Sequence, residues 1–350
     1  MEIKEVIDYL KSYNGRELKL MEVCGTHTAA IFRNGIRDLI SPKIHLISGP
    51  GCPVCVTPTA YIDKCVEYAG KPGFELLTFG DMMKVPGTNG SLSENKAGLS
   101  QADISLMYSP FEAIEKAAAN PQTTYVVAAV GFETTAPTYA LMIREAAVRG
   151  LTNIRLLTAL KTAIPALNWI CENQNDIDGF ICPGHVSVIT GCRVYDVLAE
   201  KYGKPFVVSG FEAEHILAAI YRIVKQIEAG EGRVENMYPN AVHDDGNAKA
   251  LAAIAETFSP GPAMWRGLGV IKGSGLYLKG IYAAYDGGSM GLDYDMELPE
   301  GCRCGAVITG KINPDECPMF AGGKCTPTSP FGPCMVSSEG SCGIWYRNRH

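Results

Sequence analysis

The chain has 350 residues, a formal net charge of −6, and 47% hydrophobic against 19% charged residues. This length exceeds a typical single domain, so we expect two or three domains, each with a substantial core. No block of lysines and arginines appears, which disfavours nucleic acid as a partner, and no apolar run approaches the roughly 20 residues that cross a bilayer. The first 13 residues have the pattern of an amphipathic helix rather than a secretion signal, so we expect a soluble, cytoplasmic protein.

Cysteine is the unusual part of the composition, with 13 residues. Reducing conditions in the cytoplasm disfavour structural disulfides. This count therefore points to metal ligation or thiol redox chemistry.

Between residues 18 and 210, short apolar runs alternate with amphipathic stretches, the pattern of a doubly wound parallel sheet. Strands are predicted at 18–24, 44–48, 75–80, 124–131, 154–160, 179–182 and 205–210, and helices at 59–69, 109–120, 137–150 and 193–203. Ligands of such sheets gather at the carboxyl ends of the strands, and most of these strands end in Gly, Cys, Thr or Pro.

A weak internal repeat predicts how the chain divides. One strand leads into "CGTHT" (24–28) and a later one into "GFETTAP" (131–137), which indicates two similar α/β lobes that face one another. After about residue 235 turn residues replace the periodicity, as in 258–275, and six cysteines follow between 302 and 342. We expect two α/β domains, 1–120 and 121–235, and a small, loop-rich, metal-stapled unit at 236–350.

The tail cysteines suit an iron–sulfur cluster. Cys302, Cys317, Cys325 and Cys342 are separated by gaps of 14, 7 and 16 residues. Soft thiolates from flexible loops can wrap a [4Fe–4S] cluster. Zinc sites usually show two close cysteine pairs, and this tail has one, Cys302 with Cys304, so the spacing favours iron–sulfur over zinc and over disulfides.

A second group, "GPGCPVC" (49–55), places Cys52 and Cys55 in a C-x-x-C pair. We expect a helix to follow, with Thr57 as its N-cap and Pro58 at its first position. The positive end of that helix would favour reversible disulfide chemistry or iron ligation, and half of a zinc site is the alternative.

The third group is "CGTHT". Cys24 follows a strand and precedes a helix that Thr26 or Thr28 is expected to cap, so its thiol should lie where the sheet presents ligands. Cys24 is a candidate nucleophile or metal anchor. His27 is a candidate base or a donor behind a metal, and a structural role in packing is equally open.

Three further strand ends carry polar side chains: Glu133 in "GFETTAP", His185 in "CPGHVSVI" (182–189), and Asp81 with Lys84 in "FGDMMKVPG" (79–87). Each is a candidate for the same site. Ordinary turn and helix-cap chemistry would also explain each of them singly, and their convergence on one edge is the stronger argument.

Together these motifs resemble one family, the hydrogenase maturation proteins of the HypD type. "CGTHT", "GPGCPVC", "GFETT", "PGHVSVI" and the tail from "CGAVITGKINPDEC" to "GSC" match its signature blocks in order, over residues 18–346. The resemblance implies two facing α/β domains and a third domain with a [4Fe–4S] cluster. It also implies a scaffold that acts with HypC to assemble the Fe(CN)₂CO group of [NiFe]-hydrogenase, with cyanide delivered by HypE.

The resemblance assigns roles to individual residues. Cys24 would hold the iron under construction, and Cys52 with Cys55 would be the redox-active pair. The cluster would be bound by the four tail cysteines, with Cys302 preferred over Cys304 because the family has a wide-gap pattern; Cys334 would be a spare thiol or part of a disulfide near the cluster.

Two other functions remain open from the sequence. One is an enzyme, an iron–sulfur-dependent protein disulfide reductase that uses the cluster and Cys52–Cys55. The other is a zinc-stapled interaction module. No glycine-rich phosphate loop of the Walker type is present in the sequence.

Overall fold

Two parallel sheets organise the part of the chain that the computed structural model describes, residues 2–98, 103–296 and 300–348. Sheet A has the order β2-β1-β7-β8-β9 and sheet B the order β4-β3-β5-β6. Every strand pair within them is parallel. Sheet A comprises β1 (Leu18–Glu22), β2 (Ile44–Ser48), β7 (Gly179–Pro183), β8 (Phe206–Ser209) and β9 (Val234–Asn236). Sheet B comprises β3 (Phe74–Thr78), β4 (Ile104–Leu106), β5 (Thr124–Gly131) and β6 (Ile154–Leu160).

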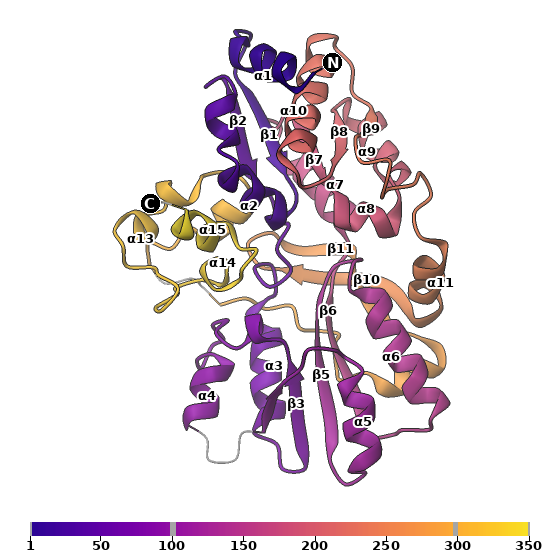
Figure 1. The fold of residues 1–350 in the computed structure, drawn as a ribbon. Coiled ribbons are helices and arrows are strands. Elements are labelled where there is room, and N and C mark those ends of the chain that lie inside the picture. Colours follow the sequence, from indigo (N-terminus) through magenta and orange to yellow (C-terminus); the bar gives the residue numbers. More distant parts are fainter. Residues whose placement is uncertain (1, 99–102, 297–299, 349–350) are drawn as a thin grey trace.

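Helices surround the two sheets, which form two lobes stacked one above the other (Figure 1). Around sheet A lie α1 (Ile3–Ser12), α2 (Gly25–Arg33), α8 (Gly184–Thr190), α9 (Asp196–Tyr202) and α10 (Ala213–Glu228). Around sheet B lie α3 (Thr59–Ala69), α4 (Leu92–Gly98), α5 (Glu112–Ala119), α6 (Ala136–Val148) and α11 (Ala248–Thr257), and α7 (Ala163–Asn173) connects β6 to β7. Short 3-10 segments lie at Ile36–Leu39, Gly80–Met82, Arg193–Tyr195, Gly280–Tyr285 and Pro314–Glu316. The expected fold class, two facing α/β units with a loop-rich C-terminal part, is confirmed.

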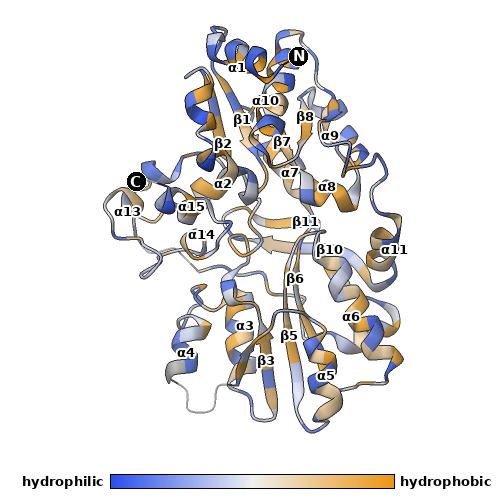
Figure 2. Ribbon diagram, viewed as in Figure 1, coloured by the Kyte–Doolittle hydropathy of each residue, from blue (hydrophilic) through white to orange (hydrophobic). Residues whose placement is uncertain are grey.

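The strands are hydrophobic along most of their length because helices cover both faces of each sheet (Figure 2). Every residue of β7 is buried, and so are all residues of β8. Phe180 and Phe206 stack between these two strands at a centroid distance of 4.6 Å. Such continuous apolar runs made the seven predicted strands recognisable, whereas β4 and β9, of three residues each, carry too few positions to show a pattern.

The strand pairing does not follow the expected division at residue 120. Leu20 of β1 pairs with Gly179 of β7, and Leu76 of β3 pairs with Val126 of β5. Each sheet is therefore built from segments on both sides of that boundary. Local periodicity identifies strands, but it does not state which strands pair.

Residues 258–275, which we expected to be rich in turns, belong to an antiparallel hairpin of β10 (Phe258–Trp265) and β11 (Gly269–Leu278). The ladder is irregular between Gly261 and Ala263, which explains why its proline and glycine residues resemble loop sequence. Leu276 and Leu278 join the apolar core of sheet B, and α11 packs on α6. The hairpin and α11 therefore pack with the sheet B lobe, and the hairpin turn also contacts the cysteine-rich tail, where a Cβ added at Gly267 would lie 2.8 Å from the Cα of Gly305.

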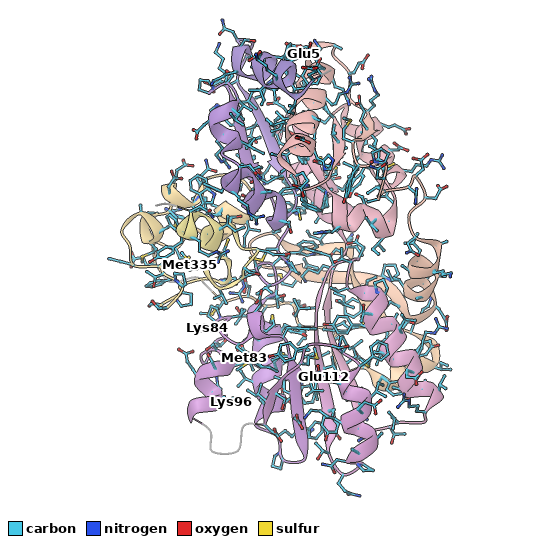
Figure 3. The ribbon with its side chains drawn as sticks, viewed as in Figure 1. Glu5, Met83, Lys84, Lys96, Glu112 and Met335 are labelled. Carbon is cyan, nitrogen blue, oxygen red and sulfur yellow. A yellow bond between two sulfur atoms is a disulfide. The ribbon has the colours of Figure 1, made fainter. Side chains whose placement is uncertain are left out.

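Residues 300–348 form a small module with short helices, α12 (Cys304–Ile308), α13 (Pro318–Ala321), α14 (Pro333–Val336) and α15 (Ser341–Arg347). The module touches both lobes. Trp345 packs edge-on against Phe32 of α2 at 4.9 Å, and the hydroxyls of Ser337 and Ser338 donate to Asp81 after β3. Figure 3 shows Met335 of this module above Met83 and Lys84 of the sheet B lobe.

Within the described ranges, none of the helices combines the length and the apolar character that a membrane span requires.

Candidate functional site

The carboxyl ends of the two sheets face each other, and a small pocket lies between them. Val23 and Pro183 line it from sheet A, Phe132 and Ala163 line it from sheet B, and Trp265 of the hairpin completes it. The motifs CGTHT, GPGCPVC, GFETT and PGHVSVI all follow strands that end at this junction. The geometry thus brings together segments that are far apart in the chain, from Val23 to Trp265.

Cys24 is the N-cap residue of α2, a position that we had assigned to Thr26 or Thr28. Its extended backbone (φ −156°, ψ 127°) turns the chain from β1 into the helix. Burial raises the pKa of the Cys24 thiol, and the nearby Glu339 carboxylate raises it further. The Thr26 hydroxyl and the N–H groups of the first helical turn act in the opposite direction. The buried free thiol is therefore neutral, and its thiolate form needs a positive partner.

His27 is fully buried and does not turn toward the pocket thiols. Its Nε2 donates to the Gly210 carbonyl at 3.0 Å, and its ring lies 4.7 Å from the ring of Phe211. Burial lowers the pKa of His27 to about 4, so the imidazole is neutral. Its Nδ1 has no hydrogen-bond partner among the described residues. These contacts show His27 fixing the segment after β8 in place.

His185 stacks on the same aromatic ring, with a centroid distance of 4.0 Å to Phe211. It is exposed, and partial burial lowers its pKa. Phe211 therefore contacts two histidines, which follow β1 and β7.

Glu133 follows β5 and caps the N-terminus of α7, because its Oε1 accepts from the N–H of Ala163 at 2.8 Å. Its Oε2 is buried and has no partner in the described part of the chain. Burial raises the pKa of Glu133 to about 7, so the carboxyl group changes charge near neutral pH. The fully buried Tyr195 has a pKa raised well above its usual range, first by burial and then by Cys182, with smaller effects from Glu133 and Cys24. Glu133 and Cys24 thus approach the same phenol from different sheets.

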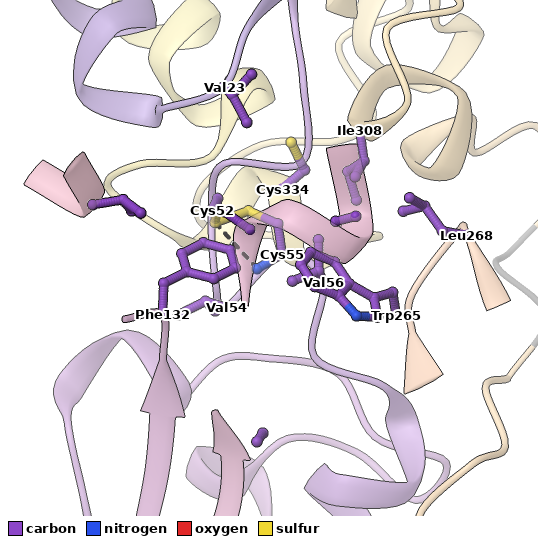
Figure 4. Close-up of a cluster of buried hydrophobic side chains, with 14 of the residues drawn as sticks. Val23, Cys52, Val54, Cys55, Val56, Phe132, Trp265, Leu268, Ile308 and Cys334 are labelled. Carbon is purple, nitrogen blue, oxygen red and sulfur yellow. Dashed lines mark hydrogen bonds between the residues drawn. A yellow bond between two sulfur atoms is a disulfide. The ribbon is translucent and has the colours of Figure 1, made fainter. Parts of the chain in front are cut away.

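Cys52 and Cys55 form a disulfide with a Cα–Cα distance of 5.2 Å. The following helix starts at Thr59 with Pro58 as its N-cap, one residue later than the predicted cap, because the Thr57 hydroxyl donates back to the Pro53 carbonyl at 2.9 Å. The disulfide is buried, with Cys52 6% and Cys55 1% exposed. Figure 4 shows it among Val23, Phe132, Trp265 and Cys334.

The disulfide loop packs directly on the backbone of Cys24. A Cβ atom added at Gly51 would lie 2.6 Å from the Cys24 nitrogen, and one added at Gly25 would lie 2.2 Å from the Glu339 carbonyl oxygen. Only glycine permits these approaches. The glycines of GPGCPVC and CGTHT therefore serve to bring the disulfide loop, Cys24 and the C-terminal module together.

All six tail cysteines line one pocket, whose walls also include Phe320, Gly332 and Met335; the cysteines are Cys302, Cys304, Cys317, Cys325, Cys334 and Cys342. Burial raises the pKa of Cys302 to about 12. The Cys334 sulfur accepts from the N–H of Cys342 at 3.3 Å and is also hydrogen-bonded to the Cys304 thiol. In the described ranges, no three or more His, Cys, Asp or Glu side chains are close enough together to hold a single metal ion.

Cys334 also lines a second pocket, together with Cys52, Cys55 and Glu339. It is therefore the residue shared between the six-cysteine pocket and the disulfide. The resemblance leaves Cys334 as a spare thiol or as part of a disulfide near the cluster. In the structure it is a free thiol, and no spacing signal indicates its place between the two pockets.

Asp81 and Lys84 do not line the pockets that contain these thiols. Asp81 contacts the serines of the C-terminal module, and Lys84 is exposed. Sequence reasoning also missed Glu339 and Lys161. Lys161 follows β6, its Nζ donates to the Met264 carbonyl at 2.7 Å, and burial lowers its pKa to about 7. A strand-end position was the only signal that could have indicated it.

The fold and the site define an α/β protein in which thiols and one disulfide gather where the carboxyl edges of two parallel sheets meet a cysteine-rich module.

Similarity to known proteins identifies the family of this chain. A family model described as "HypD: Hydrogenase formation hypA family" matches residues 1–349. The chain is 43% identical to the hydrogenase maturation factor HypD of Rhodobacter capsulatus, over 99% of this chain and 93% of the relative. It is 42% identical to HypD of Escherichia coli, over 99% and 93%, and 39% identical to a putative hydrogenase expression/formation protein of Methanocaldococcus jannaschii, over 99% and 97%. The chain belongs to the HypD family.

Proposed function

We propose that this protein is a hydrogenase maturation factor that, with HypC, holds iron while the Fe(CN)₂CO group of [NiFe]-hydrogenase is assembled. The supporting observation is the contact between Cys24 and the Cys52–Cys55 loop at the junction of the two sheets. One free thiol and one disulfide there lie on neighbouring backbone segments. Membership of the HypD family indicates that such a pair would act in hydrogenase maturation.

Cys24 is the anchor in this proposal. Iron that carries cyanide and carbonyl ligands is soft, and a thiolate is its natural protein ligand. The N–H groups of the first turn of α2 and the Thr26 hydroxyl would stabilise negative charge on the sulfur. HypC would supply further ligands, and HypE would deliver cyanide.

The C-terminal module has the residues that a [4Fe–4S] cluster needs. Six thiols line one small pocket with apolar walls, and thiolates are the usual ligands of such clusters. We assign Cys302, Cys317, Cys325 and Cys342 as the ligands, the set that the wide-gap pattern of the family implies. When bound, the cluster would supply single electrons.

The Cys52–Cys55 disulfide would be the redox-active group of this chain. Its reduction takes two electrons and two protons and yields two thiols beside Cys24. Cys334 lines a pocket together with Cys52 and Cys55, and it would be the thiol that links the C-terminal module to the disulfide.

The test is infrared spectroscopy of the anaerobic complex with HypC, isolated from cells that contain HypE. We expect cyanide and carbonyl bands for the wild type, and we expect Cys24→Ala to lose these bands while it keeps the brown colour of the cluster. Cys171→Ala, a buried cysteine in α7 outside the site, is the matched control and should keep both. If Cys24→Ala retained the bands, the iron anchor would lie elsewhere.

A protein disulfide reductase is the second candidate, since a disulfide lies next to a pocket of six thiols. The burial of Cys52 and Cys55 argues against it, because a protein substrate would have to reach sulfurs that are at most 6% exposed. Turnover of an external protein disulfide by the isolated, cluster-loaded protein would favour the reductase.

A further inference from the structure

A pocket of about 550 Å³ opens at the carboxyl edge of sheet B, on the side of the disulfide loop away from Cys24's helix. Its walls come from three strand ends: Phe79 to Met82 after β3, Tyr108 to Pro110 after β4, and Val130 near the end of β5 with Thr135 after it. Val54, between the two disulfide cysteines, also lines it. The volume is in the range of small-ligand sites.

The position is the one at which open α/β sheets bind ligands. Strand β4 lies beside β3 on one edge, and β5 lies beside β3 on its other edge. The direction in which successive strands are added therefore reverses between β3 and β5. Crevices outside the carboxyl ends of strands at such a reversal are the usual ligand sites of this architecture. The 13-residue helix α6 starts at the same place, directly after Thr135.

Tyr139 supplies an independent indication of a ligand. It lines the pocket, it is 1% exposed, and its hydroxyl has no hydrogen-bond partner among the described residues. A buried hydroxyl without a partner costs free energy, and phenylalanine would fill the same space without that cost. Burial raises the pKa of Tyr139, so the hydroxyl keeps its proton and can donate it to an acceptor.

The remaining lining restricts the chemistry of the ligand. Phe79, Met82 and Tyr108 provide apolar contact, and Tyr108 is 91% exposed and could cover a ligand with its ring. Asp81 carries a negative charge at the pocket, and the described residues that line it include no lysine or arginine. Phosphates and carboxylates would therefore meet no cation there.

We infer that this pocket binds a small, uncharged carbonyl compound with an apolar body, whose carbonyl oxygen accepts the Tyr139 hydroxyl. This site is separate from the proposed iron anchor at Cys24. Because Val54 forms part of the wall, the ligand contacts the loop that carries the Cys52–Cys55 disulfide.

The test uses 4-fluoroacetophenone as a probe and ¹⁹F NMR line broadening on the full-length protein. We expect the probe to broaden with wild type, and Tyr139→Phe to weaken its binding roughly tenfold, the loss of one hydrogen bond. Tyr108→Ala should weaken it as well. Tyr139→Phe should fold at least as well as wild type because it removes an unpartnered hydroxyl, and thermal unfolding checks this.

Two comparisons make the result decisive. Tyr221→Phe, on α10 of the other lobe, should leave binding unchanged. The anion 4-fluorobenzoate, of nearly the same shape, should bind at least tenfold more weakly than the ketone. Equal binding of the ketone to wild type and Tyr139→Phe, or equal binding of the two probes, would overturn the inference.

Discussion

Single buried polar atoms mark the places where this protein departs from ordinary core packing. Glu133 uses one carboxyl oxygen to cap α7 and leaves the other without a partner, and Lys161 has a single carbonyl for its ammonium group. Burial moves the pKa of both groups to about 7, from opposite directions. Both follow strands of sheet B at the junction with sheet A, where their charge would act on bound cargo.

Glu133 makes stability depend on pH in a defined direction. Its pKa is raised from 4.5 to about 7 in the folded protein, so the folded state favours the protonated form. The free energy of unfolding should therefore fall as pH rises from about 4.5 to about 7. Each pH unit of difference between the folded and unfolded pKa corresponds to about 1.4 kcal/mol, so the loss is up to about 3 kcal/mol.

Glu133→Gln tests this, since the amide oxygen can still accept from Ala163 and carries no charge. At pH 8 the variant should be more stable than wild type by up to about 3 kcal/mol in urea unfolding, and the two should converge near pH 4.5. A difference that did not change with pH would show that the carboxyl group is already charged in the folded state over the whole range.

At the scale of elements, α2 and the segment before α15 are held together by a close backbone approach. Cys24 starts α2, Gly25 is its first residue, and the Glu339 backbone lies against that glycine. Trp345 of α15 packs on Phe32 at the other end of α2, and Arg37 lies over both rings. The C-terminal module is thus clamped along the whole length of the helix that Cys24 begins.

Gly25→Ala should disturb this clamp. The added Cβ would lie 2.2 Å from the Glu339 carbonyl oxygen, so backbone must move, and we expect a loss of roughly 1–3 kcal/mol in the free energy of unfolding. Gly80→Ala is the control, because nothing lies within 4 Å of a Cβ there, and it should change stability by no more than about 0.5 kcal/mol. Equal effects of the two substitutions would mean that the module does not rest on α2.

In the whole molecule, the disulfide loop is one of the segments that connect the two lobes, and several elements hold it in place. It runs from β2 of sheet A to α3 of the other lobe. Arg266 of the hairpin turn, only 1% exposed, donates to the Thr57 carbonyl at 2.9 Å and pairs with Asp295 at 3.4 Å. The disulfide loop therefore connects the two lobes and contacts the hairpin.

Thiol counting by mass spectrometry checks that Cys52 and Cys55 form a disulfide and that the other cysteines are free. The chain has 13 cysteines, and two of them form the disulfide, so 13 − 2 leaves 11 free thiols. Alkylation in denaturant with an iron chelator should add 11 groups without reductant and 13 after reduction. Peptide mapping should assign the two protected residues to Cys52 and Cys55; thirteen groups without reductant would contradict the disulfide.

Much of the architecture could be read from local patterns. Continuous apolar runs such as 124–131 and 179–182 are long enough to identify buried parallel strands, and α3 has the predicted bounds, 59–69. Helix caps were less predictable. Thr57 bonds back to Pro53 and Cys24 takes the cap position of α2, since the close packing of the loop, not cap preference, decides both.

The sequence by itself determined the fold class, the strand-end motifs and the family, because apolar periodicity and short motifs are local properties of the chain. Tertiary structure decided which strands share a sheet, that residues 258–278 form a hairpin on sheet B, and that His27 turns to Gly210. It also decided that Cys334 lies between the six-cysteine pocket and the disulfide, and that Tyr139 has no partner beside an open pocket. These are contacts between distant segments, and they follow from how the two sheets and the module pack and not from the order of residues within any one of them.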